Sequence, residues 1–305
     1  MQFRQVDTLR SFSRRFTQRL GLLRDAPYDP SLSLLESRIV FELANARTPP
    51  RAKDLATTLG VDKGYLSRLL DGLRRRRVLT LRKGEDRREK LLALTPEGRQ
   101  LFRRIDRVSR DRSKALLDQL GPARAASLSR ELGAATLALG DRVMPEEVKL
   151  RTELEPGDLG WVIQRHGEIY ADEYGWDTGF ENLVAEIAVA FVKKHDPARE
   201  RAWIATARGQ RLGCVFLVRE GAAVAKLRIL LVEPSVRGLG LGTLLVKTCV
   251  EFARAAGYRR ITLWTNDVLV SARRIYEAEG FTLEKEEKHE SFGKKLTGQY
   301  WGKAL

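Results

Sequence analysis

Three glycines at every second position mark the clearest candidate for chemistry in this 305-residue chain: Gly238, Gly240 and Gly242. An aliphatic run at 226–232 precedes them and is typical of a strand, and an apolar-periodic helix is expected over 244–256. Glycine lets the backbone turn tightly and approach a ligand, and the first N–H groups of a helix attract anions. Because Arg237 adds a positive charge at the loop entrance, the stretch predicts a phosphate-binding site.

Spacing distinguishes this loop from two other glycine-rich phosphate loops. A dinucleotide-binding fold requires G-x-G-x-x-G and an acidic residue on a second strand, but this chain has G-x-G-x-G and no acid at the required distance. A Walker-type loop requires Gly-Lys-Ser/Thr, and no lysine precedes Thr243. The pattern that fits is Arg-x-x-Gly-x-Gly, although glycine clusters also form ordinary turns that bind nothing.

The sequence downstream of the loop favours the binding interpretation. It continues with a strand expected over 260–265, Asn266, a helix expected over 268–279 that carries Tyr276, and Gly280-Phe281. The order and residue types from about Ala225 to Phe281 resemble the GNAT superfamily of acetyl-coenzyme A dependent N-acetyltransferases. The resemblance implies that acetyl-coenzyme A is the co-substrate and that its pyrophosphate lies at the glycine loop.

The same resemblance assigns roles to individual residues. Cofactor contacts are implied on the central strand, the loop and the following asparagine: Leu230, Leu231, Val232, Arg237, Gly238, Leu239, Gly240, Leu241, Gly242, Thr243 and Asn266. The phenol of Tyr276 is implied to protonate the sulfur of the departing coenzyme A. The alternative is that Tyr276 is an aromatic side chain that packs beside Ile275 on one face of its helix.

An acceptor site is expected around an aromatic and acidic segment, residues 170–177. By resemblance this region lines the acceptor pocket, and the candidate contacts are Tyr170, Glu173, Tyr174, Trp176, Arg228 and His289. Packing of the aromatic rings between helices explains the same segment equally well. Two cations on the central strand, Lys226 and Arg228, disfavour a lysine-rich peptide and favour an acceptor that carries a carboxylate.

No general base for the acceptor amine is evident. Glu173 or an ordered chain of waters could remove the proton. The three histidines, His166, His195 and His289, are scattered along the chain, so each is expected to be packed or at the surface, and no metal site is expected. Both cysteines lack metal or redox spacing and are expected to be reduced core residues.

Charge divides the chain into two parts. Residues 1–145 contain 31 Lys/Arg and 17 Asp/Glu, a balance of +14, whereas residues 146–305 contain 24 and 23, a balance of +1. A strongly basic first half predicts a domain that binds a polyanion. Two domains are therefore expected, 1–145 and 146–305, joined by a linker around 140–157.

In the first half, helices are expected over 34–43 and 52–59, and a third begins after Asp62. Gly60 suits the left-handed conformation that ends a helix, and the carboxylate of Asp62 suits the cap of the next one. Two helices joined by such a turn form a helix-turn-helix. The second one buries a stripe of leucines: Leu66, Leu69, Leu70 and Leu73. The residues that face outward near the start of this helix are those that would contact base edges in a recognition helix: Lys63, Gly64, Tyr65, Ser67 and Arg68.

Two strands, expected over 78–82 and 90–95, flank a basic tip that can reach phosphates or the minor groove. The tip, Asp86-Arg87-Arg88, and the run from Leu94 to Arg99 resemble the wing of MarR-family winged-helix regulators. That family usually has a glycine before the wing, where this chain has arginines at 74–77. The resemblance implies double-stranded DNA as a partner, contacted by Lys63, Tyr65, Ser67, Arg68, Arg82, Arg87 and Arg88. The alternative is a solvated basic helix surface.

Long apolar-periodic helices over 6–23 and 115–139, the latter broken at Gly121-Pro122, are implied by this resemblance to form a homodimer. The expected fold is a mainly α winged helix-turn-helix followed by an α/β GNAT fold with a mixed, mostly antiparallel sheet. We expect a bifunctional regulator and acetyltransferase of a small amine. The alternatives are an acetyl-coenzyme A sensor without turnover, an enzyme whose first domain only dimerises, and a protein-lysine acetyltransferase. No secretory signal or membrane span is visible, so the expected compartment is the cytoplasm.

Overall fold

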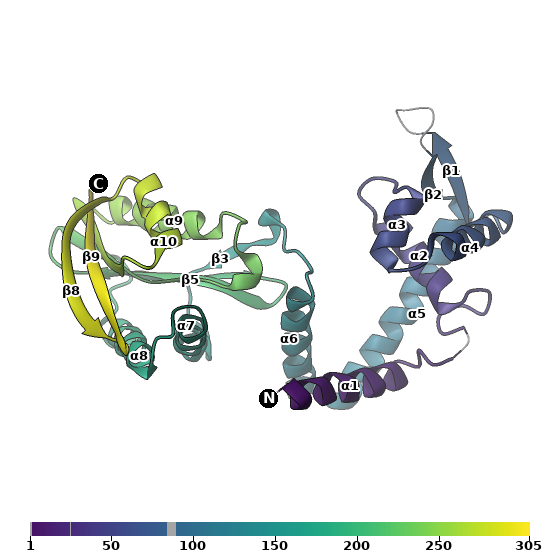
Figure 1. The fold of residues 1–305 in the computed structure, drawn as a ribbon, viewed down its shortest axis with the longest axis horizontal. Helices are drawn as coiled ribbons and strands as arrows, with labels where there is room; N and C mark the ends of the chain where they lie inside the picture. Colours follow the sequence, from purple (N-terminus) through teal and green to yellow (C-terminus); the bar gives the residue numbers. More distant parts are fainter. Residues whose placement is uncertain (1, 25, 84–89) are drawn as a thin grey trace. The chain divides into compact units, whose positions relative to one another are not determined.

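The computed structural model describes residues 2–24, 26–83 and 90–305, in two compact units divided between Ser127 and Leu128 (Figure 1). The division lies inside helix α6 (Pro122–Ala138), ahead of the stretch at 140–157 where the sequence predicts a linker. The part of α6 after the division belongs to the second unit, where the Gln210 side chain donates to the Arg130 carbonyl at 3.0 Å and Leu137 contacts the core.

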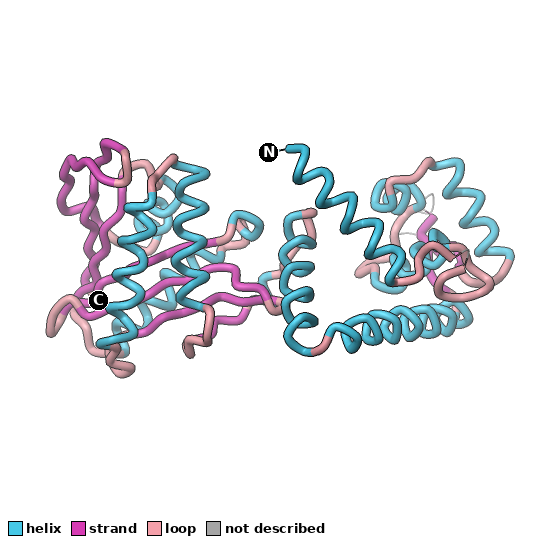
Figure 2. The backbone as a smooth tube through the Cα atoms, turned by 90° about the horizontal axis from the view of Figure 1, so that it is seen from below, coloured by secondary structure: helices cyan, strands magenta, loops and turns pink. Residues whose placement is uncertain are grey.

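The first unit is mainly helical (Figure 2). Before α6 it contains α1 (Gln2–Arg19), α2 (Leu34–Asn45), α3 (Ala52–Leu59), α4 (Lys63–Arg75), β1 (Leu79–Lys83), β2 (Lys90–Leu94) and α5 (Pro96–Leu120). Helix α1 ends four residues earlier than the sequence predicts. The helix predicted from 115 begins at Pro96 instead, because the Thr95 hydroxyl accepts the Gly98 N–H at 3.0 Å and caps a much longer helix.

Local sequence explains how α3 turns into α4. Gly60 has φ 64° and ends α3, and the Asp62 carboxylate accepts the Tyr65 N–H at 2.8 Å and begins α4, both as predicted. Three of the four leucines are buried and the fourth, Leu69, is half-buried. Arg77 adopts φ 58° where the sequence lacks a glycine, so the turn forms at a cost of about 1 kcal/mol.

The second unit is a seven-stranded sheet with helices on both faces. Its elements are the turn Pro145–Glu147, β3 (Lys149–Arg151), α7 (Asp158–Tyr174), α8 (Thr178–Lys194), β4 (Arg201–Ala207), β5 (Gln210–Arg219), β6 (Val224–Val232), the turn Pro234–Val236, α9 (Leu241–Ala255), β7 (Arg260–Asn266), α10 (Val270–Ala278), β8 (Thr282–Ser291) and β9 (Lys294–Ala304). The strand order is β3-β4-β5-β6-β7-β9-β8, and within residues 149–304 only β6 and β7 pair in parallel. This confirms the predicted mixed, mostly antiparallel sheet.

Helices α9 and α10 cover one face of the sheet, and α7 and α8 cover the other (Figure 1). Each face has its own core: α9 packs through Leu245 and Cys249 on one side, and α8 packs through Val184 and Phe191 on the other. Both cysteines are buried thiols, as predicted. In the described ranges no helix combines the length and the apolarity that crossing a bilayer requires.

Strands β6 and β7 separate halfway along their length. They pair only over Val224–Leu227 and Arg260–Leu263 within the described sheet. Ile229 lies at the separation with φ 54°, and the register of β5 against β6 shifts at the same level. A β-branched residue in this conformation is rare and costs about 1–2 kcal/mol. The sheet remains continuous because β6 goes on pairing with β5 and β7 with β9, so an opening forms between β6 and β7.

Charged side chains fix α7 to this sheet. The Asp158 carboxylate is buried at the start of α7 and accepts from Arg151 at 2.8 Å and Arg211 at 2.7 Å. Burial by itself raises the pKa of Asp158, but the arginines and a backbone N–H outweigh it and hold that pKa below its ordinary value. Farther along α7, Arg165 donates twice to Glu233, at 2.7 and 2.8 Å, which ties the helix to the end of β6.

Replacing Asp158 with Asn should lower the free energy of unfolding of the second unit by about 3 kcal/mol, because two arginines lose their buried counter-charge. Since the fold lowers the pKa of Asp158, its contribution is present at neutral pH and lost as the pH falls through the folded value. The difference between Asp158→Asn and wild type should therefore shrink in acid. Denaturant titration followed by tryptophan fluorescence isolates this unit, because all five tryptophans lie within residues 161–301.

The matched control is Asp141→Asn, which removes a half-exposed ion pair with Arg208 and should cost little. Equal losses of stability for the two variants would contradict the role assigned to Asp158.

Candidate active site

The glycine loop joins β6 to α9. A single turn leads out of β6, and α9 begins at Leu241 with Gly240 as its N-cap. Gly238 and Gly240 have φ 82° and 76°, a conformation that glycine adopts without strain. The predicted helix start at 244 is wrong, because Gly242 already belongs to the first turn. A Cβ at Gly242 would lie 2.7 Å from Cδ1 of Ile275, so this glycine lets α9 pack against α10.

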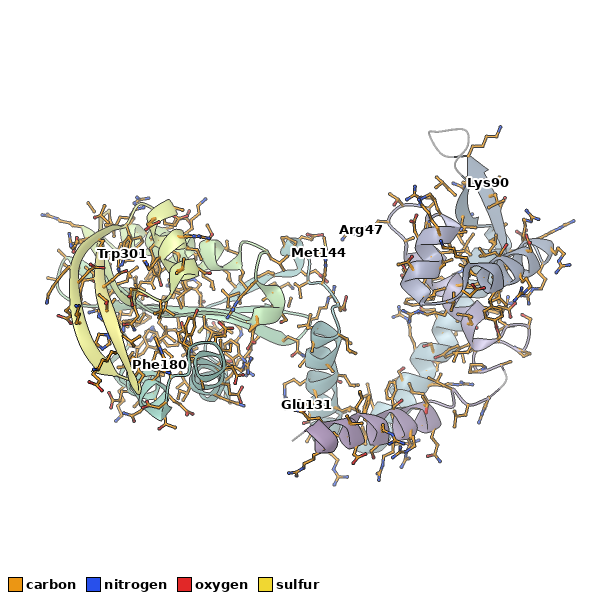
Figure 3. The ribbon with its side chains drawn as sticks, viewed as in Figure 1. Arg47, Lys90, Glu131, Met144, Phe180 and Trp301 are labelled. Atoms are coloured by element: carbon orange, nitrogen blue, oxygen red, sulfur yellow. The ribbon has the colours of Figure 1, made fainter. Side chains whose placement is uncertain are left out.

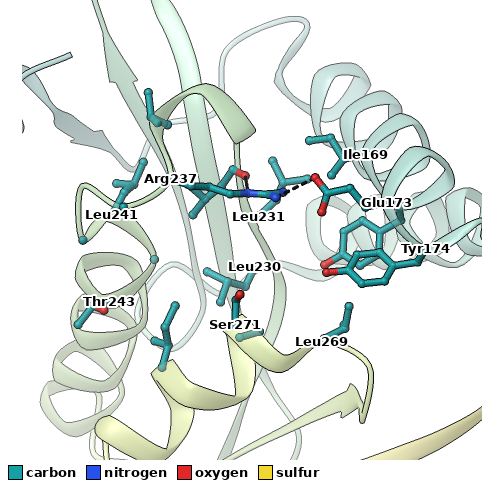
Figure 4. A pocket seen from close by; sticks show the side chains of 18 residues that line it. Ile169, Glu173, Tyr174, Leu230, Leu231, Arg237, Leu241, Thr243, Leu269 and Ser271 are labelled. Carbon is teal, nitrogen blue, oxygen red and sulfur yellow. Dashed lines mark hydrogen bonds and ion pairs between the residues drawn. The ribbon is translucent and has the colours of Figure 1, made fainter. Parts of the chain in front are cut away.

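A cleft of about 360 Å³ lies between the loop, the end of β6, α7 and the start of α10 (Figure 4). Nine of the eleven predicted cofactor residues line it: Leu230, Leu231, Val232, Arg237, Gly238, Gly240, Leu241, Gly242 and Thr243. Leu239 packs against the core instead, and Asn266 lies outside the cleft. Six further lining residues were not proposed from the sequence as contacts: Ile169, Val236, Leu269, Ser271, Ala272 and Ile275. Most belong to helices that reach the loop only through tertiary packing, which no local pattern reveals.

A second cavity, of about 90 Å³, lies where β6 and β7 separate, and we name it the inner cavity. It shares with the cleft Tyr170, Leu230, Leu269 and Ala272. Its other lining residues include four that the sequence proposed: Trp176, Arg228, Asn266 and Tyr276. The predicted site is therefore divided between a cleft at the glycine loop and an inner cavity at the opening in the sheet.

An ion pair spans the cleft (Figure 4). Arg237 Nη1 lies 2.8 Å from Glu173 Oε1, and the two side chains are 46% and 30% exposed. Tyr174 lines the cleft beside Glu173. An anion that binds Arg237 at the loop would compete with Glu173 for the same guanidinium.

Residues 160–281 match the model of the Acetyltransferase (GNAT) family. An uncharacterized N-acetyltransferase of Schizosaccharomyces pombe is 34% identical over 136 residues, which are 44% of this chain and 79% of that relative. The chain belongs to the GNAT acetyltransferase family. This GNAT protein is an acyltransferase, and acetyl-coenzyme A is its acetyl donor.

Other similar proteins share shorter segments or the general fold. The N-acetylaspartate synthetase of Danio rerio is 30% identical over 106 residues, 34% of this chain and 36% of that relative, so the chain spans about a third of its length. Two solved structures each align with 52% of the chain. A GNAT-family acetyltransferase of Streptococcus pneumoniae has TM-score 0.43, 19% identity and 100% of its own chain covered. The spermidine N-acetyltransferase of Vibrio cholerae was solved in complex with coenzyme A and spermine. It has TM-score 0.41, 20% identity and 96% of its own chain covered.

The loop of this GNAT protein suits the phosphates of its co-substrate. A Cβ at Gly240 would meet no atom within 4 Å, so the backbone there faces open space. The first N–H groups of α9 have no partner within the helix and carry its positive dipole end. When bound, acetyl-coenzyme A supplies the acetyl thioester, and the loop and Arg237 would hold its pyrophosphate.

Tyr276 is buried on α10, where it lines the inner cavity and packs edge-on against Phe281 at 5.9 Å between ring centroids. Its hydroxyl has no hydrogen-bond partner among the described residues. Burial raises the pKa of Tyr276 well above the usual range, so the phenol keeps its proton at neutral pH. The side chain thus both packs in the core and presents a proton donor to the inner cavity.

The two cations of β6 have different surroundings. Lys226 Nζ lies 2.6 Å from a carboxylate oxygen of Glu220 and is neutralised there. Arg228 lines the inner cavity, half-buried, without a hydrogen bond or ion pair to any described residue. Desolvation lowers the pKa of Arg228, against the attraction of Glu220. An unpaired guanidinium in such a place is costly unless an anion joins it.

His289 lines neither cavity, contrary to the prediction. Its Nε2 donates to the Asn266 amide oxygen at 2.8 Å, and its Nδ1 lies 3.0 Å from the Ser291 hydroxyl. His289 therefore orients the buried Asn266 from the edge of the sheet. In the aromatic segment 170–177, Tyr170 and Trp176 line the inner cavity, and their ring centroids also lie 5.1 Å apart. The same rings therefore both line a cavity and pack on each other.

The residues proposed to contact DNA lie on the surface of the first unit. Lys63, Tyr65, Ser67 and Arg68 are exposed on α4, and Arg82 is exposed on β1. Arg87 and Arg88 lie outside the described residues. Among the residues that are described, no group of three or more His, Cys, Asp or Glu side chains is arranged to hold a metal ion.

Replacing Glu173 with Gln should tighten acetyl-coenzyme A binding by about threefold to fivefold, because Arg237 loses the carboxylate that competes with phosphate. Isothermal calorimetry measures the change. Asp172→Asn is the matched control, since it removes the same charge from the neighbouring exposed residue of α7, and its affinity should stay near wild type. Weaker binding by Glu173→Gln would mean that the ion pair does not oppose the cofactor.

Proposed function

We propose that the protein acetylates a small primary amine that carries a carboxylate, and that Arg228 binds this carboxylate. The observation that carries the proposal is the unpaired Arg228 guanidinium in the inner cavity, which adjoins the cleft at the glycine loop. Guanidinium and carboxylate form strong paired hydrogen bonds. The same cation disfavours lysine-rich peptides. In support, the name of the Danio rerio relative describes a synthetase of an acetylated amino acid.

In this proposal the glycine loop, Arg237 and Leu230–Val232 bind acetyl-coenzyme A, and Tyr276 protonates the departing sulfur. The protonated phenol beside the opening in the sheet favours an enzyme over a sensor. Glu173 is less suited to be the base than the sequence suggests, because it lies in the cleft and is paired with Arg237.

Acetyl-coenzyme A consumption should be measured with the proteinogenic amino acids and, beside each, the amine that lacks its carboxylate. The amino acids should be the better acceptors. Arg228→Met should lower kcat/KM for the best of them by about 10- to 100-fold, the loss expected for a charged hydrogen bond, and change the decarboxylated amine little.

Lys226→Met is the matched control, because Lys226 is already paired with Glu220 and should contribute little to acceptor binding. A preference for the decarboxylated amines, or a wild-type kcat/KM for Arg228→Met, would refute the proposal that the acceptor carries a carboxylate. Absence of turnover with every amine, despite tight acetyl-coenzyme A binding, would favour the sensor.

We further propose that the first unit is a MarR-type winged helix-turn-helix that binds double-stranded DNA, so that the protein is a regulator as well as an enzyme. The support is the α3–turn–α4 arrangement, the exposed polar face of α4, the β1–β2 hairpin after it and the +14 charge of residues 1–145. Exposed apolar residues on one face of α1, Val6, Leu9 and Phe12, support a homodimer.

Binding of the 305-residue protein to a random-sequence DNA duplex should weaken steeply as salt rises. Lys63→Ala combined with Arg82→Ala should reduce the slope of log affinity against log salt by about two per subunit, which fluorescence anisotropy can measure. The control pair Lys193→Ala and Lys247→Ala removes two exposed charges from the second unit and should leave the slope unchanged. DNA binding that is absent, or insensitive to salt, would exclude the regulator.

A further inference from the structure

His166 on α7 lines the inner cavity, and its Nε2 is buried without a hydrogen-bond partner among the described residues. The whole side chain is only 2% exposed, so bulk water does not satisfy this nitrogen. A buried acceptor left unsatisfied costs about 1–3 kcal/mol. A phenylalanine would pack among the neighbouring rings without that cost, so the nitrogen requires an explanation.

The surroundings of His166 fix its tautomer. Nδ1 lies 2.7 Å from the Val162 carbonyl oxygen, which can only accept, so Nδ1 carries the hydrogen and Nε2 a free lone pair. Burial lowers the pKa of His166 to about 4 despite that hydrogen bond, and the imidazole is therefore neutral at physiological pH. Tyr170 and Phe180 hold the ring, with centroids 5.9 and 6.2 Å away.

No other side chain of the inner cavity can serve as a base. Of its lining residues, all of which the structure describes, the ionisable ones are His166, Tyr170, Arg228 and Tyr276, and none is Asp or Glu. Arg228 is a cation, and burial raises the pKa of both tyrosines beyond the usual range, so they keep their protons. The neutral imidazole is the remaining proton acceptor.

We propose that Nε2 of His166 binds the acceptor amine and accepts its proton during acetyl transfer. The amine nitrogen donates a hydrogen bond to Nε2 and attacks the thioester carbonyl carbon with its lone pair. As the C–N bond forms and the C–S bond breaks, the N–H proton passes to Nε2 and sulfur takes a proton from Tyr276. The proton on His166 then restores the phenol, which leaves the amide and free coenzyme A.

The weak basicity of His166 is compatible with this step. Such an imidazole does not deprotonate a free ammonium ion, so the acceptor must arrive as the neutral amine. Its N–H becomes far more acidic once the nitrogen is bonded to the carbonyl carbon, and a weak base then suffices. The inference rests on the proposed entry of an amine into the inner cavity, but it does not require that the amine carry a carboxylate.

Three variants separate binding from proton transfer. His166→Phe keeps an aromatic ring and should lower kcat/KM by about 10²- to 10⁴-fold, while the affinity for acetyl-coenzyme A stays within about threefold of wild type. His166→Gln retains a hydrogen-bond acceptor without basicity, so KM for the amine should approach wild type while kcat remains low. His195→Phe is the control, because His195 is exposed and lines neither cavity.

A spectroscopic measurement on wild type keeps the test independent of variant folding. Long-range ¹H–¹⁵N spectra of the three imidazoles should show His166 as the neutral Nδ1–H tautomer down to about pH 5. With coenzyme A present, the Nε2 resonance should shift on addition of the amine. The probe is the best acceptor of the amine panel, or n-propylamine if the panel contains none.

An Nε2–H tautomer, a resonance that ignores the amine, or wild-type turnover by His166→Phe would each overturn the proposal. The two proposals fail in different experiments. If the acceptor carries no carboxylate, Arg228→Met has no effect on kcat/KM, whereas the His166 variants and spectra still give the results expected here.

Discussion

The separation of β6 from β7 is the constraint on which the rest of the second unit depends. The two parallel strands pair over four residues each, and Ile229 takes a left-handed conformation where they part. Strand β6 still pairs with β5, and β7 still pairs with β9, so the sheet stays continuous on both sides of the opening. The opening therefore introduces only local backbone strain. That opening lets α7 and α8 from one face of the sheet and α10 from the other line one inner cavity (Figure 1).

The charges around the site follow from this geometry. Asp158 and the Arg165–Glu233 pair anchor α7, which brings Glu173 to Arg237 at the glycine loop. The loop cation is therefore neutralised until an anion replaces the carboxylate. Arg228 has no such partner among the described residues, because it lies on the part of β6 that has left β7. Arg237 has Glu173 as its partner, whereas for Arg228 we propose that the carboxylate of the acceptor is the partner.

Local patterns in the sequence predicted much of this arrangement. The aliphatic run at 226–232 lies within β6, and the Arg-x-x-Gly-x-Gly pattern located the loop and the cleft, because glycine conformation and helix N-termini act within a few residues. The partition of Tyr276 and Asn266 into a second cavity was missed. So was the pairing of Asn266 with His289, 23 positions along the chain. Such contacts depend on tertiary packing. The left-handed conformation of Ile229 is one that β-branched residues rarely adopt, so residue propensity does not predict it.

We propose that acetyl-coenzyme A occupies the opening between β6 and β7, with its phosphates at the glycine loop. The decisive experiment is a crystal structure of the 305-residue protein with coenzyme A. In that structure the pyrophosphate should lie within hydrogen-bonding distance of backbone N–H groups at 238–243, Glu173 should be displaced from Arg237, and the sulfur should lie beside the Tyr276 hydroxyl. A cofactor bound away from the loop, or a pantetheine arm that does not enter the opening, would contradict it.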